Sequence, residues 1–311
     1  MYLGLDIGGT NLKVGIMNDK NELVQQIHQS TNAAKGLDYL LNLIKRVINT
    51  SITKFPMIKA IGVGIPGVVQ PDGTVRFSPN LPEWVDVPFG KFLGNVFSLP
   101  IIVDNDANTA AYAEMLIGSG KDLNNFIYVT LGTGVGGSIV LDRKIYRGET
   151  NGAGEFGYII IDNIEPTVAP DKAYRIGTVE SALGKNNVTE FSKRYIKSFP
   201  NSQMHKFEKP DPYFISQAVT DGDEAAISIF KIMGRNLGIG LVSAMNLLDI
   251  RVAIIGGGLS LADPFFLEYT EKFVKERALP HIAANARVIR AEFTKDAGVI
   301  GAALLAKSLV K

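Results

Sequence analysis

Two segments of the sequence share one plan, and this repeat constrains the fold more than any other feature. Residues 1–23 and 125–146 each run from an apolar stretch through a polar glycine turn into a second apolar stretch and a charged loop. Superposing Asp6 on Thr130, at an offset of 124 positions, aligns the two glycine turns. The repeat predicts two related halves that each open with a β-hairpin and face one cleft. The alternative is that any two glycine-turn hairpins look alike.

Predicted strands and helices alternate along the rest of the chain. Strands are expected over residues 2–6, 12–17, 60–65, 101–103, 126–131, 137–141 and 252–255. Helices are expected over residues 37–49, 106–117, 223–248, 264–277 and 296–310. Alternation of this kind predicts an α/β architecture.

The length of 311 residues suits two domains, because single hydrophobic cores stop growing near roughly 250–300 residues. We expect a smaller domain over residues 1–107 plus 295–311 and a larger one over 108–294. Within the larger domain, residues 163–216 contain five prolines and are predicted to be irregular. This segment is either an ordered insertion over the cleft or a mobile lid.

Composition excludes several classes of function. Lys and Arg number 32 against 31 Asp and Glu, so the chain has no strong field with which to hold nucleic acid or an anionic membrane. The sequence has no cysteine, which excludes disulfides, thiolate metal sites and a thiol nucleophile. No leader-like segment opens the chain, and no apolar run reaches the ~18 residues of a membrane span. We therefore expect a cytoplasmic protein that binds neither nucleic acid nor membrane.

The two glycine turns are suited to phosphate binding. Glycines without a Cβ let backbone N–H groups approach a phosphate, and the carboxylate of Asp6 can hold a hydrated Mg²⁺. The turn at residues 131–137 lacks both the Gly-Lys-Ser/Thr of a Walker loop and the helix of a dinucleotide-binding fingerprint. Ordinary tight hairpins are the alternative for both turns. The candidate nucleotide-binding residues on the two hairpins are Asp6, Gly8, Gly9, Thr10, Asn11, Lys13, Thr133 and Gly134.

The run Asp-Asn-Asp-Ala-Asn at residues 104–108 ends a predicted strand and begins a predicted helix. One of these polar side chains is expected to cap the helix, but four of them exceed what capping requires. A carboxylate fixed at such a point can accept a proton from an attacking hydroxyl, which phosphoryl transfer to an alcohol needs.

Two other loops point to ligand binding. Residues 252–260 run from a strand into three glycines, which leave room for a flat base or ribose, or which form an ordinary strand-to-helix loop. Residues 78–84 place Asn80 and the one tryptophan, Trp84, in a proline-containing loop. An asparagine and a tryptophan together suit the hydroxyl groups and the C–H face of a polyhydroxy ligand.

Residues 151–158, Asn-Gly-Ala-Gly-Glu-Phe-Gly-Tyr, put a single carboxylate, Glu155, among small and apolar residues. A buried charge is costly unless it is paired or hydrogen-bonded. Tight glycine turns can hold such a carboxylate so that it accepts hydrogen bonds from hydroxyl groups. Tyr158 either offers its hydroxyl to a polar group of a ligand or packs against the isoleucine run that follows.

Taken together and in this order, the motifs DIGGTN, GIPG (64–67), DNDAN, LGTGVGG, GEFGY and GGGLS resemble the ROK family of sugar kinases and repressors, particularly its glucokinase-like members. The resemblance covers nearly the whole chain. It implies a two-domain actin-like ATPase (ribonuclease H-like) fold, with duplicated α/β domains that close around a central cleft on a sugar and Mg²⁺-ATP. It also implies a homo-oligomer, either a dimer or a tetramer.

The resemblance further implies roles for individual residues. Asp106 corresponds to the catalytic base that takes the proton from the sugar hydroxyl. The implied substrate contacts are Gly67, Asn80, Asn105, Asp106, Glu155, Tyr158 and Glu180. The implied cofactor contacts are the phosphate turns named above, together with Gly257 and Gly258 where family members hold adenosine.

Zinc-bearing members of the family place a histidine after Gly-Glu-x-Gly and continue into a Cys-x-Cys-Gly-x-x-Gly-Cys-x-Glu segment. This chain has Tyr158 in place of the histidine, and Asp171, Ala173 and Thr178 where the three cysteines would stand. We therefore predict no structural zinc. Some zinc-less branches, including certain N-acetylmannosamine kinases, also carry tyrosine here, which leaves the identity of the sugar open.

The predicted function is ATP-dependent phosphorylation of a hexose, glucose at its C6 hydroxyl, as a step of carbohydrate metabolism such as glycolysis. N-acetylmannosamine or another N-acetylhexosamine is the alternative substrate, and polyphosphate is an alternative donor. A sugar-responsive transcriptional repressor and a non-catalytic sugar sensor are alternatives from another class. We expect no repressor, because such members carry an N-terminal helix-turn-helix and Asp6 lies close to the start of this sequence.

Overall fold

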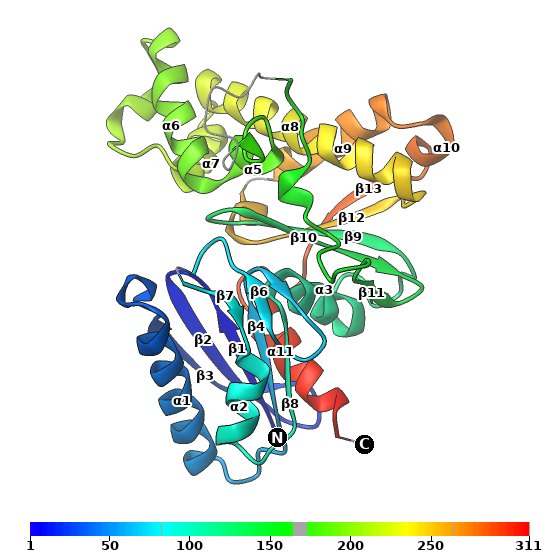
Figure 1. Cartoon of the computed structure of the whole chain (residues 1–311). Helices are drawn as coiled ribbons and strands as arrows, with labels where there is room; N and C mark the ends of the chain where they lie inside the picture. Colours follow the sequence, from blue (N-terminus) through cyan, green and yellow to red (C-terminus); the bar gives the residue numbers. More distant parts are fainter. Residues whose placement is uncertain (82, 164–172, 263, 311) are drawn as a thin grey trace. The chain divides into compact units, whose positions relative to one another are not determined.

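The chain divides into two compact units. The computed structural model describes residues 1–81, 83–163, 173–262 and 264–310 (Figure 1). Unit 1 comprises Met1–Lys121, Ile145–Ala153 and Asp296–Lys311, and unit 2 comprises Asp122–Lys144 and Gly154–Lys295. This division falls after Lys121, whereas the expected boundary was at 107/108. A boundary at 107/108 would cut helix α3 (Asp106–Ile117), which packs against α11 (Ala297–Ser308) of unit 1.

Unit 1 is built on a five-stranded sheet in the order β3-β2-β1-β4-β8. The strands are β1 (Tyr2–Ile7), β2 (Asn11–Met17), β3 (Leu23–Ser30), β4 (Ala60–Ile65) and β8 (Ile101–Asn105). β1, β2 and β3 pair antiparallel, whereas β1 with β4 and β4 with β8 pair parallel. A small antiparallel sheet of β5 (Val68–Val69), β6 (Val75–Phe77) and β7 (Val85–Val87) follows β4.

One face of the five-stranded sheet carries a row of three glycines, on which helix α11 packs directly. Gly4 is paired with Gly15 on β2 and with Gly62 on β4, so the three lie side by side. A Cβ on Gly4 would overlap the carbonyl oxygen of Val299, and one on Gly62 would overlap that of Ala302. At Gly4 and Gly62 the backbone of α11 therefore rests on the backbone of the sheet, while at Gly15 the side chain of Val299 lies against the glycine.

Helix α3 is held by the same kind of contact. A Cβ on Gly301 of α11 would overlap the carbonyl oxygen of Thr109, and one on Gly64 of β4 would lie 2.7 Å from Thr109 Oγ1. Both glycines let the first turn of α3 lie close to α11 and β4. Asp106 heads that turn, so these contacts determine where its carboxylate stands.

The opposite face of the sheet is covered by apolar side chains. Leu3, Leu5 and Ile7 of β1 alternate with the residues of the glycine face and join a core with helix α1 (Leu37–Lys54), helix α2 (Phe89–Val96) and the 3₁₀ turn Ala33–Lys35.

Trp84 belongs to this core and does not present its ring to a ligand. It is 1% exposed and packs edge-on against Phe89, with ring centroids 5.0 Å apart. The expectation that Trp84 meets a polyhydroxy ligand is therefore wrong, because the loop turns the ring inward and buries it.

Unit 2 repeats the plan of unit 1. Its sheet has the order β11-β10-β9-β12-β13, with β9 and β10 antiparallel and β9, β12 and β13 parallel. The strands are β9 (Phe126–Leu131), β10 (Val135–Leu141), β11 (Lys144–Tyr146), β12 (Val252–Gly256) and β13 (Arg287–Arg290). Every bound of β9 and β10 lies 124 positions after the matching bound of β1 and β2, so the predicted duplication is confirmed.

The helices of unit 2 pack on this sheet and on one another. They are α5 (Val179–Leu183), α6 (Lys185–Tyr195), α7 (Pro212–Thr220), α8 (Glu224–Leu248), α9 (Pro264–Arg277) and α10 (Pro280–Ala283), with 3₁₀ turns at Phe156–Tyr158, Ile196–Ser198, Gln203–Lys206 and Gly258–Leu261. By length and composition α8 would be able to cross a membrane, but 56% of its most apolar stretch is buried within the protein. Ile229 and Leu237 of α8 pack with Ile127 and Val129 of β9, so α8 is a core helix.

The segment 163–216 is predicted to be irregular, and its described part is instead mostly helical. It contains α5, α6 and the beginning of α7. Pro212 is the first residue of α7, where the missing N–H has no cost, and Asp211 caps that helix by accepting a hydrogen bond from the Tyr213 N–H at 3.0 Å. Pro212 therefore contributes to the irregular composition of this segment although it begins a helix. Residues 164–172 lie outside the described residues.

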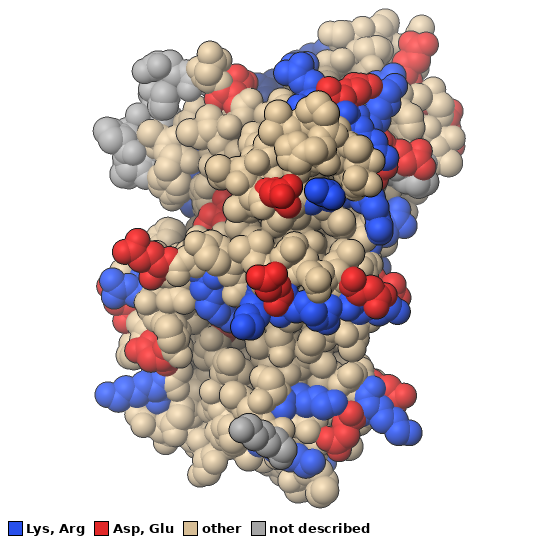
Figure 2. Space-filling view, turned by 90° about the vertical axis from the view of Figure 1, so that its right-hand side faces the viewer, with Lys and Arg blue, Asp and Glu red and all other residues tan. Residues whose placement is uncertain are grey.

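Charged side chains of both signs share the surface drawn in Figure 2. On that face basic side chains lie beside acidic ones, as 32 basic and 31 acidic residues lead one to expect. Such a mixed surface has little long-range attraction for a polyanion.

Gly301→Ala tests the contact between α11 and α3. We expect the variant to lose about 1–3 kcal/mol of unfolding free energy, because the added methyl group overlaps the backbone of Thr109. Gly94→Ala in α2 is the matched control, since no atom lies within 4 Å of its added Cβ. Alanine should stabilise that helix by about 0.5–1 kcal/mol. Urea unfolding measures both, and an undiminished stability of Gly301→Ala would contradict the close contact.

Candidate active site

The candidate catalytic residues of unit 1 follow the carboxyl ends of its parallel strands. Asp6 is the last but one residue of β1, Gly67 follows β4, and Asn105 ends β8. Carboxyl ends of neighbouring parallel strands meet at one edge of a sheet, where α/β proteins bind their ligands. Motifs that are far apart in the sequence are thereby brought to one edge.

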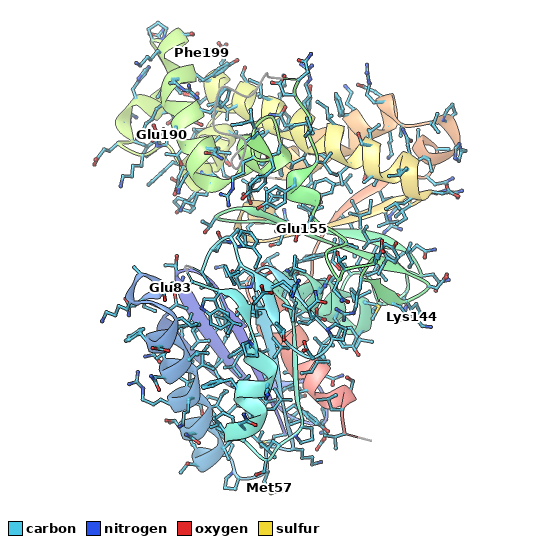
Figure 3. All side chains as sticks on the ribbon, viewed as in Figure 1. Met57, Glu83, Lys144, Glu155, Glu190 and Phe199 are labelled. Carbon is cyan, nitrogen blue, oxygen red and sulfur yellow. The ribbon has the colours of Figure 1, made fainter. Side chains whose placement is uncertain are left out.

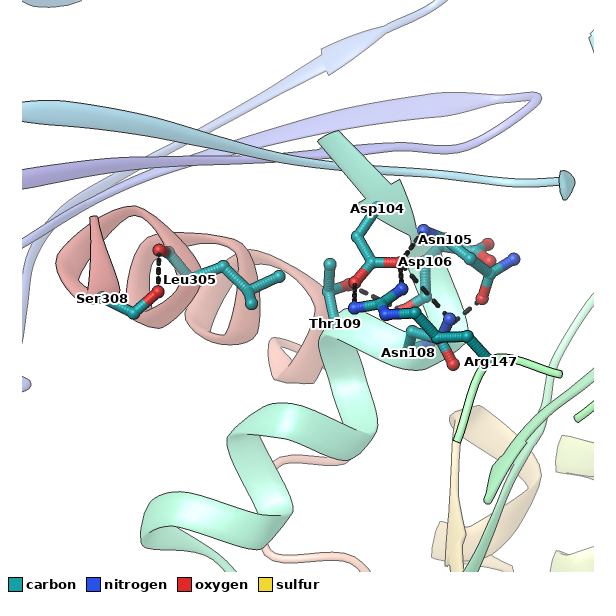
Figure 4. Close-up of polar contacts among 8 residues, drawn as sticks. All are labelled: Asp104, Asn105, Asp106, Asn108, Thr109, Arg147, Leu305 and Ser308. Carbon is teal, nitrogen blue, oxygen red and sulfur yellow. Dashed lines mark hydrogen bonds and ion pairs between the residues drawn. The ribbon is translucent and has the colours of Figure 1, made fainter. Parts of the chain in front are cut away.

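Asn105 is the cap that the run at 104–108 predicts. Its Oδ1 accepts a hydrogen bond from the Asn108 N–H at 3.0 Å (Figure 4). Its Nδ2 donates a hydrogen bond to the Gly67 carbonyl at 3.0 Å. Gly67 has a φ of 110°, and a Cβ there would overlap the carbonyl oxygen of Phe77, so glycine is required. The Asn105 amide retains one further N–H and one lone pair with which to meet a hydroxyl.

Asp106 is the first residue of α3 and is partly exposed. Its Oδ1 accepts a hydrogen bond from the Ala107 N–H at 2.9 Å, and its carbonyl oxygen accepts one from Thr109 Oγ1 at 2.7 Å. The positive end of the helix dipole stabilises a negative charge at this position. A carboxylate so placed is able to take a proton from a bound hydroxyl.

Asp104 has a different environment. It is 3% exposed, and its two oxygens accept hydrogen bonds from the Arg147 guanidinium at 2.8 and 2.6 Å (Figure 4). The bond to Asp104 also raises the pKa of Arg147 above its ordinary value. Of the two carboxylates in this motif, Asp104 is buried and held by Arg147, whereas Asp106 is partly exposed at the head of α3.

The glycine turn between β1 and β2 is closed by a hydrogen bond from the Gly8 N–H to the Asn11 carbonyl at 2.8 Å. Thr10 and Asn11 are exposed at its tip. A Cβ on Gly9 would lie 2.8 Å from the carbonyl oxygen of Asn80. This turn and the loop of Asn80, a predicted sugar contact, are therefore adjacent.

Asp6, the predicted Mg²⁺ residue, lies against the first turn of α11. Burial raises the pKa of Asp6, while Lys13 opposes this rise and Asp296 adds to it. Lys13 Nζ lies 3.9 Å from Asp296 Oδ1, which also accepts a hydrogen bond from Gln26 Nε2 at 2.7 Å. Within the described residues no cluster of three or more His, Asp or Glu side chains is suited to a metal. Asp6 therefore suits Mg²⁺ only as a single carboxylate beside an ion that keeps most of its water ligands.

The glycine turn of unit 2 is braced by Glu180. The Val135 N–H donates to Glu180 Oε2 at 2.9 Å, and a Cβ on Gly134 would overlap that oxygen. Thr133 remains exposed beside it. Glu180, a predicted sugar contact, therefore uses one oxygen to hold the predicted phosphate turn and retains the other.

Glu155 follows Gly154, which has a φ of 91°, and is labelled in Figure 3. Its side chain is exposed and not buried, contrary to what its apolar neighbours suggest, because the glycine turn projects it outward. Surrounding protein atoms and the charge of Glu180 raise the pKa of Glu155.

Tyr158 lies close to these carboxylates. Its ring is 5.6 Å from that of Tyr174, centroid to centroid. Burial, followed by the charge of Glu180, raises the pKa of Tyr158 to about 12. The hydroxyl therefore stays protonated and is able to donate a hydrogen bond.

Thr178 stands where zinc-bearing family members have a cysteine, and here it caps α5. Its Oγ1 accepts a hydrogen bond from the Ser181 N–H at 3.1 Å. Backbone hydrogen bonds from Val179 N–H to Ile159 O at 3.0 Å and from Ile161 N–H to Gly177 O at 2.7 Å join the two segments that carry Tyr158 and Glu180. Asp171 lies outside the described residues, and Ala173 has no ligand atom.

A cavity of about 550 Å³ opens within unit 2 beside the β9–β10 turn. Gly132, Thr133 and Gly258 line it. Gly258 has open space where a Cβ would stand, whereas Gly257 has a φ of 80° and packs on the backbone of Leu131. Gly258 thus faces the cavity, and Gly257 supports the turn that presents it.

Helix α7 forms one wall of this cavity. This wall is not among the elements predicted from the sequence. Its residues that line the cavity are Pro212, Tyr213, Ser216, Gln217 and Thr220. Tyr213 is 64% exposed, and its hydroxyl accepts a hydrogen bond from Gln217 Nε2 at 3.0 Å. Lys185 Nζ pairs with Asp211 Oδ2 at 2.9 Å at the head of α7. The helical spacing of these side chains was the available signal, but it lay in the segment read as irregular.

Comparison with known proteins identifies the family. The ROK family model matches residues 2–309. The chain belongs to the ROK family. A glucokinase from Halalkalibacterium halodurans is 30% identical over 98% of this chain and 94% of its own length. A xylose repressor from Caldicellulosiruptor bescii is 27% identical over 96% of this chain and 76% of its own length.

The fold of this ROK-family chain is also that of a solved relative. The crystal structure of a ROK family glucokinase from Streptomyces griseus in complex with glucose and AMPPNP superposes with a TM-score of 0.83 at 27% identity, and covers 99% of both chains. The predicted actin-like ATPase class is therefore confirmed.

The raised pKa of Asp6 predicts the effect of Asp6→Asn on stability. A carboxyl whose folded pKa is raised contributes stability below its unfolded pKa and loses it as the pH rises through the folded pKa. Relative to Asp6→Asn, the unmodified protein should therefore lose stability as the pH rises above about 4, the ordinary pKa of an aspartate. Thermal unfolding over this range, without nucleotide or metal, measures the difference.

Asp19→Asn is the control of opposite sign. A hydrogen bond from the Tyr2 hydroxyl lowers the pKa of Asp19, so this carboxylate stabilises the fold at neutral pH and loses its effect in acid. If Asp6→Asn followed the same pH dependence as Asp19→Asn, the environment assigned to Asp6 would be wrong.

Proposed function

We propose that this ROK-family chain is an ATP-dependent sugar kinase that phosphorylates a hexose, with glucose at its C6 hydroxyl as the substrate. The observation that carries the proposal is the placement of Asp106. It is the first residue of α3, its neighbour Asn105 is tied to Gly67, and the competing carboxylate Asp104 is already paired. The whole-length likeness to a glucokinase supports the choice of sugar.

Asp106 is the general base in this proposal. The sugar hydroxyl donates its proton to Asp106 while its oxygen attacks the γ-phosphorus, and the bond from that phosphorus to the oxygen of ADP breaks. The remaining N–H of Asn105 and the side chain of Asn80 hold neighbouring hydroxyl groups. In unit 2, Glu155, Tyr158 and the second oxygen of Glu180 are the corresponding sugar contacts.

The nucleotide is assigned to the cavity of unit 2. Its walls include Leu131, Leu183 and Leu259, and such apolar surface suits a nucleobase, whereas a linear polyphosphate would leave it uncovered. This favours ATP over polyphosphate as the donor. Backbone N–H groups of the glycine turns are the proposed phosphate contacts. Mg²⁺ would be held at Asp6 through water, and when bound it neutralises the charge of the phosphates.

Asp106→Asn tests the assignment of the base. The amide keeps the shape of the side chain but accepts no proton, so turnover should fall about 10²–10⁴-fold. Circular dichroism and calorimetric sugar binding should change little. Asp38→Asn is the matched control, because Asp38 is an exposed carboxylate in the first turn of α1 and should leave turnover unchanged. Normal turnover by Asp106→Asn would refute the mechanism.

The identity of the sugar is tested separately. ADP release is measured with glucose, mannose, N-acetylglucosamine and N-acetylmannosamine, each with ATP and with polyphosphate. The highest kcat/KM is expected with glucose and ATP. A preference for N-acetylmannosamine would replace the substrate, and sugar binding without turnover on any of them would favour a sugar sensor.

Tyr213→Ala tests the nucleotide site. The exposed ring stands on the wall of the cavity with its hydroxyl held by Gln217, so it is placed to stack on a base. Stacking of a base on an aromatic ring is worth roughly 1–3 kcal/mol, which corresponds to a roughly 5- to 150-fold rise in the KM for ATP. Tyr213→Phe should retain most of the affinity and the sugar KM should not change. An unaltered KM for ATP in Tyr213→Ala would remove the ring from the site.

A further inference from the structure

An ion pair between the buried Asp104 and the partly exposed Arg147 fastens a returning segment of chain to unit 1. Between Lys144 and Gly154 the chain leaves unit 2 and contributes residues 145–153 to unit 1. Arg147 in this segment makes the paired hydrogen bonds to Asp104 that Figure 4 shows. Gln70 Nε2 adds one hydrogen bond to the Thr150 carbonyl at 3.1 Å.

The Asp104 carboxylate has a complete set of partners. Besides the two bonds from Arg147, its Oδ1 accepts hydrogen bonds from the Asn105 N–H at 2.7 Å and from Asn108 Nδ2 at 3.3 Å. These partners belong to the end of β8 and the first turn of α3. Because a guanidinium and a carboxylate meet in a plane with two parallel bonds, the pair restricts orientation as well as distance.

Both ends of this ion pair lead directly to candidate sugar-site residues. Asp104 immediately precedes Asn105 and Asp106 in the chain. On the other side, the Ala153 N–H donates to the Arg147 carbonyl at 3.1 Å, which closes the loop just before Gly154 and Glu155. Asp104 therefore lies directly before Asn105 and Asp106, and Arg147 begins the loop that ends just before Glu155.

We propose that Arg147 is a positioning residue for the phosphoryl transfer, because by holding Asp104 it fixes the strand end that carries Asn105 and Asp106 and the point at which the chain enters the Glu155 turn. The inference rests on the proposed function. A buried ion pair is weak evidence for stability, since apolar residues of similar volume often stabilise a fold equally well. In this chain the pair orients residues 145–153 and the strand end that precedes Asn105 and Asp106. It also neutralises the charge of Asp104 close to Asp106.

Arg147→Met is the first test. It should lower kcat about 10- to 100-fold, as expected for a small displacement of reacting groups, and raise the sugar KM, while the KM for ATP stays unchanged. Its thermal stability should also fall, because Asp104 is left buried without its partner. Lys59→Met is the control, since it removes an exposed ion pair to Asp19 at the amino end of β4 and should alter neither kcat nor the sugar KM.

The double variant Asp104→Asn with Arg147→Met separates positioning from stability. It removes the unpaired buried charge, so thermal stability should return toward that of the unmodified protein, while kcat should remain about as low as in Arg147→Met. If kcat recovered together with stability, Arg147 would only stabilise the fold and the proposal would be overturned.

Hydrogen–deuterium exchange distinguishes a failure of this inference from a failure of the proposed function. Amides of residues 105–108 and 145–155 should exchange faster in Arg147→Met and in the double variant than in the unmodified protein, and Lys59→Met should not differ. Unchanged exchange would overturn the positioning role whatever the activity. If the unmodified protein turned over no sugar, the exchange result would still decide whether Arg147 orders both segments.

Discussion

Close packing of helix α11 on the glycine row, backbone to backbone at Gly4 and Gly62 and through the Val299 side chain at Gly15, is the constraint on which the rest of unit 1 depends. Protein interiors are close-packed, so a helix that rests directly on a sheet has little freedom to shift. Gly301 of α11 restricts α3 in the same way, because the absence of a side chain lets the backbone of Thr109 contact α11 directly. The position of Asp106 at the head of α3 therefore depends on glycines that let backbone and Thr109 atoms approach closely.

Charge pairing then distinguishes residues that look alike in the sequence. Asp104 and Asp106 are two residues apart, yet one is 3% exposed and held by Arg147 while the other is partly exposed at the head of a helix. Glu180 likewise braces the glycine turn at Val135 with one oxygen. In each case the partner comes from a distant part of the chain, so the pairing exists only in the folded protein.

The predicted strands and core helices were found because periodicity reports which side of an element is buried. The hairpins of the two units recur at the predicted offset of 124 positions. Two expectations failed. Trp84 lies in a loop as expected, but local composition does not tell that its ring is buried against Phe89. The helices within residues 173–216 were missed because composition does not tell whether a proline begins a helix or a loop. The α7 wall with Tyr213 was missed for the same reason.

The sequence by itself determined the α/β class, the duplication, the ROK-family motifs and the choice of Asp106 as the candidate base, because these depend on local pattern and order along the chain. Only the tertiary structure decided which partners the polar side chains take. Nothing local connects Arg147 to Asp104 or Gly301 to Thr109, since these contacts exist only after segments far apart in the sequence have packed together. Pairing and burial depend on that packing, and they distinguish carboxylates that hold the fold together, such as Asp104, from partly exposed ones such as Asp106.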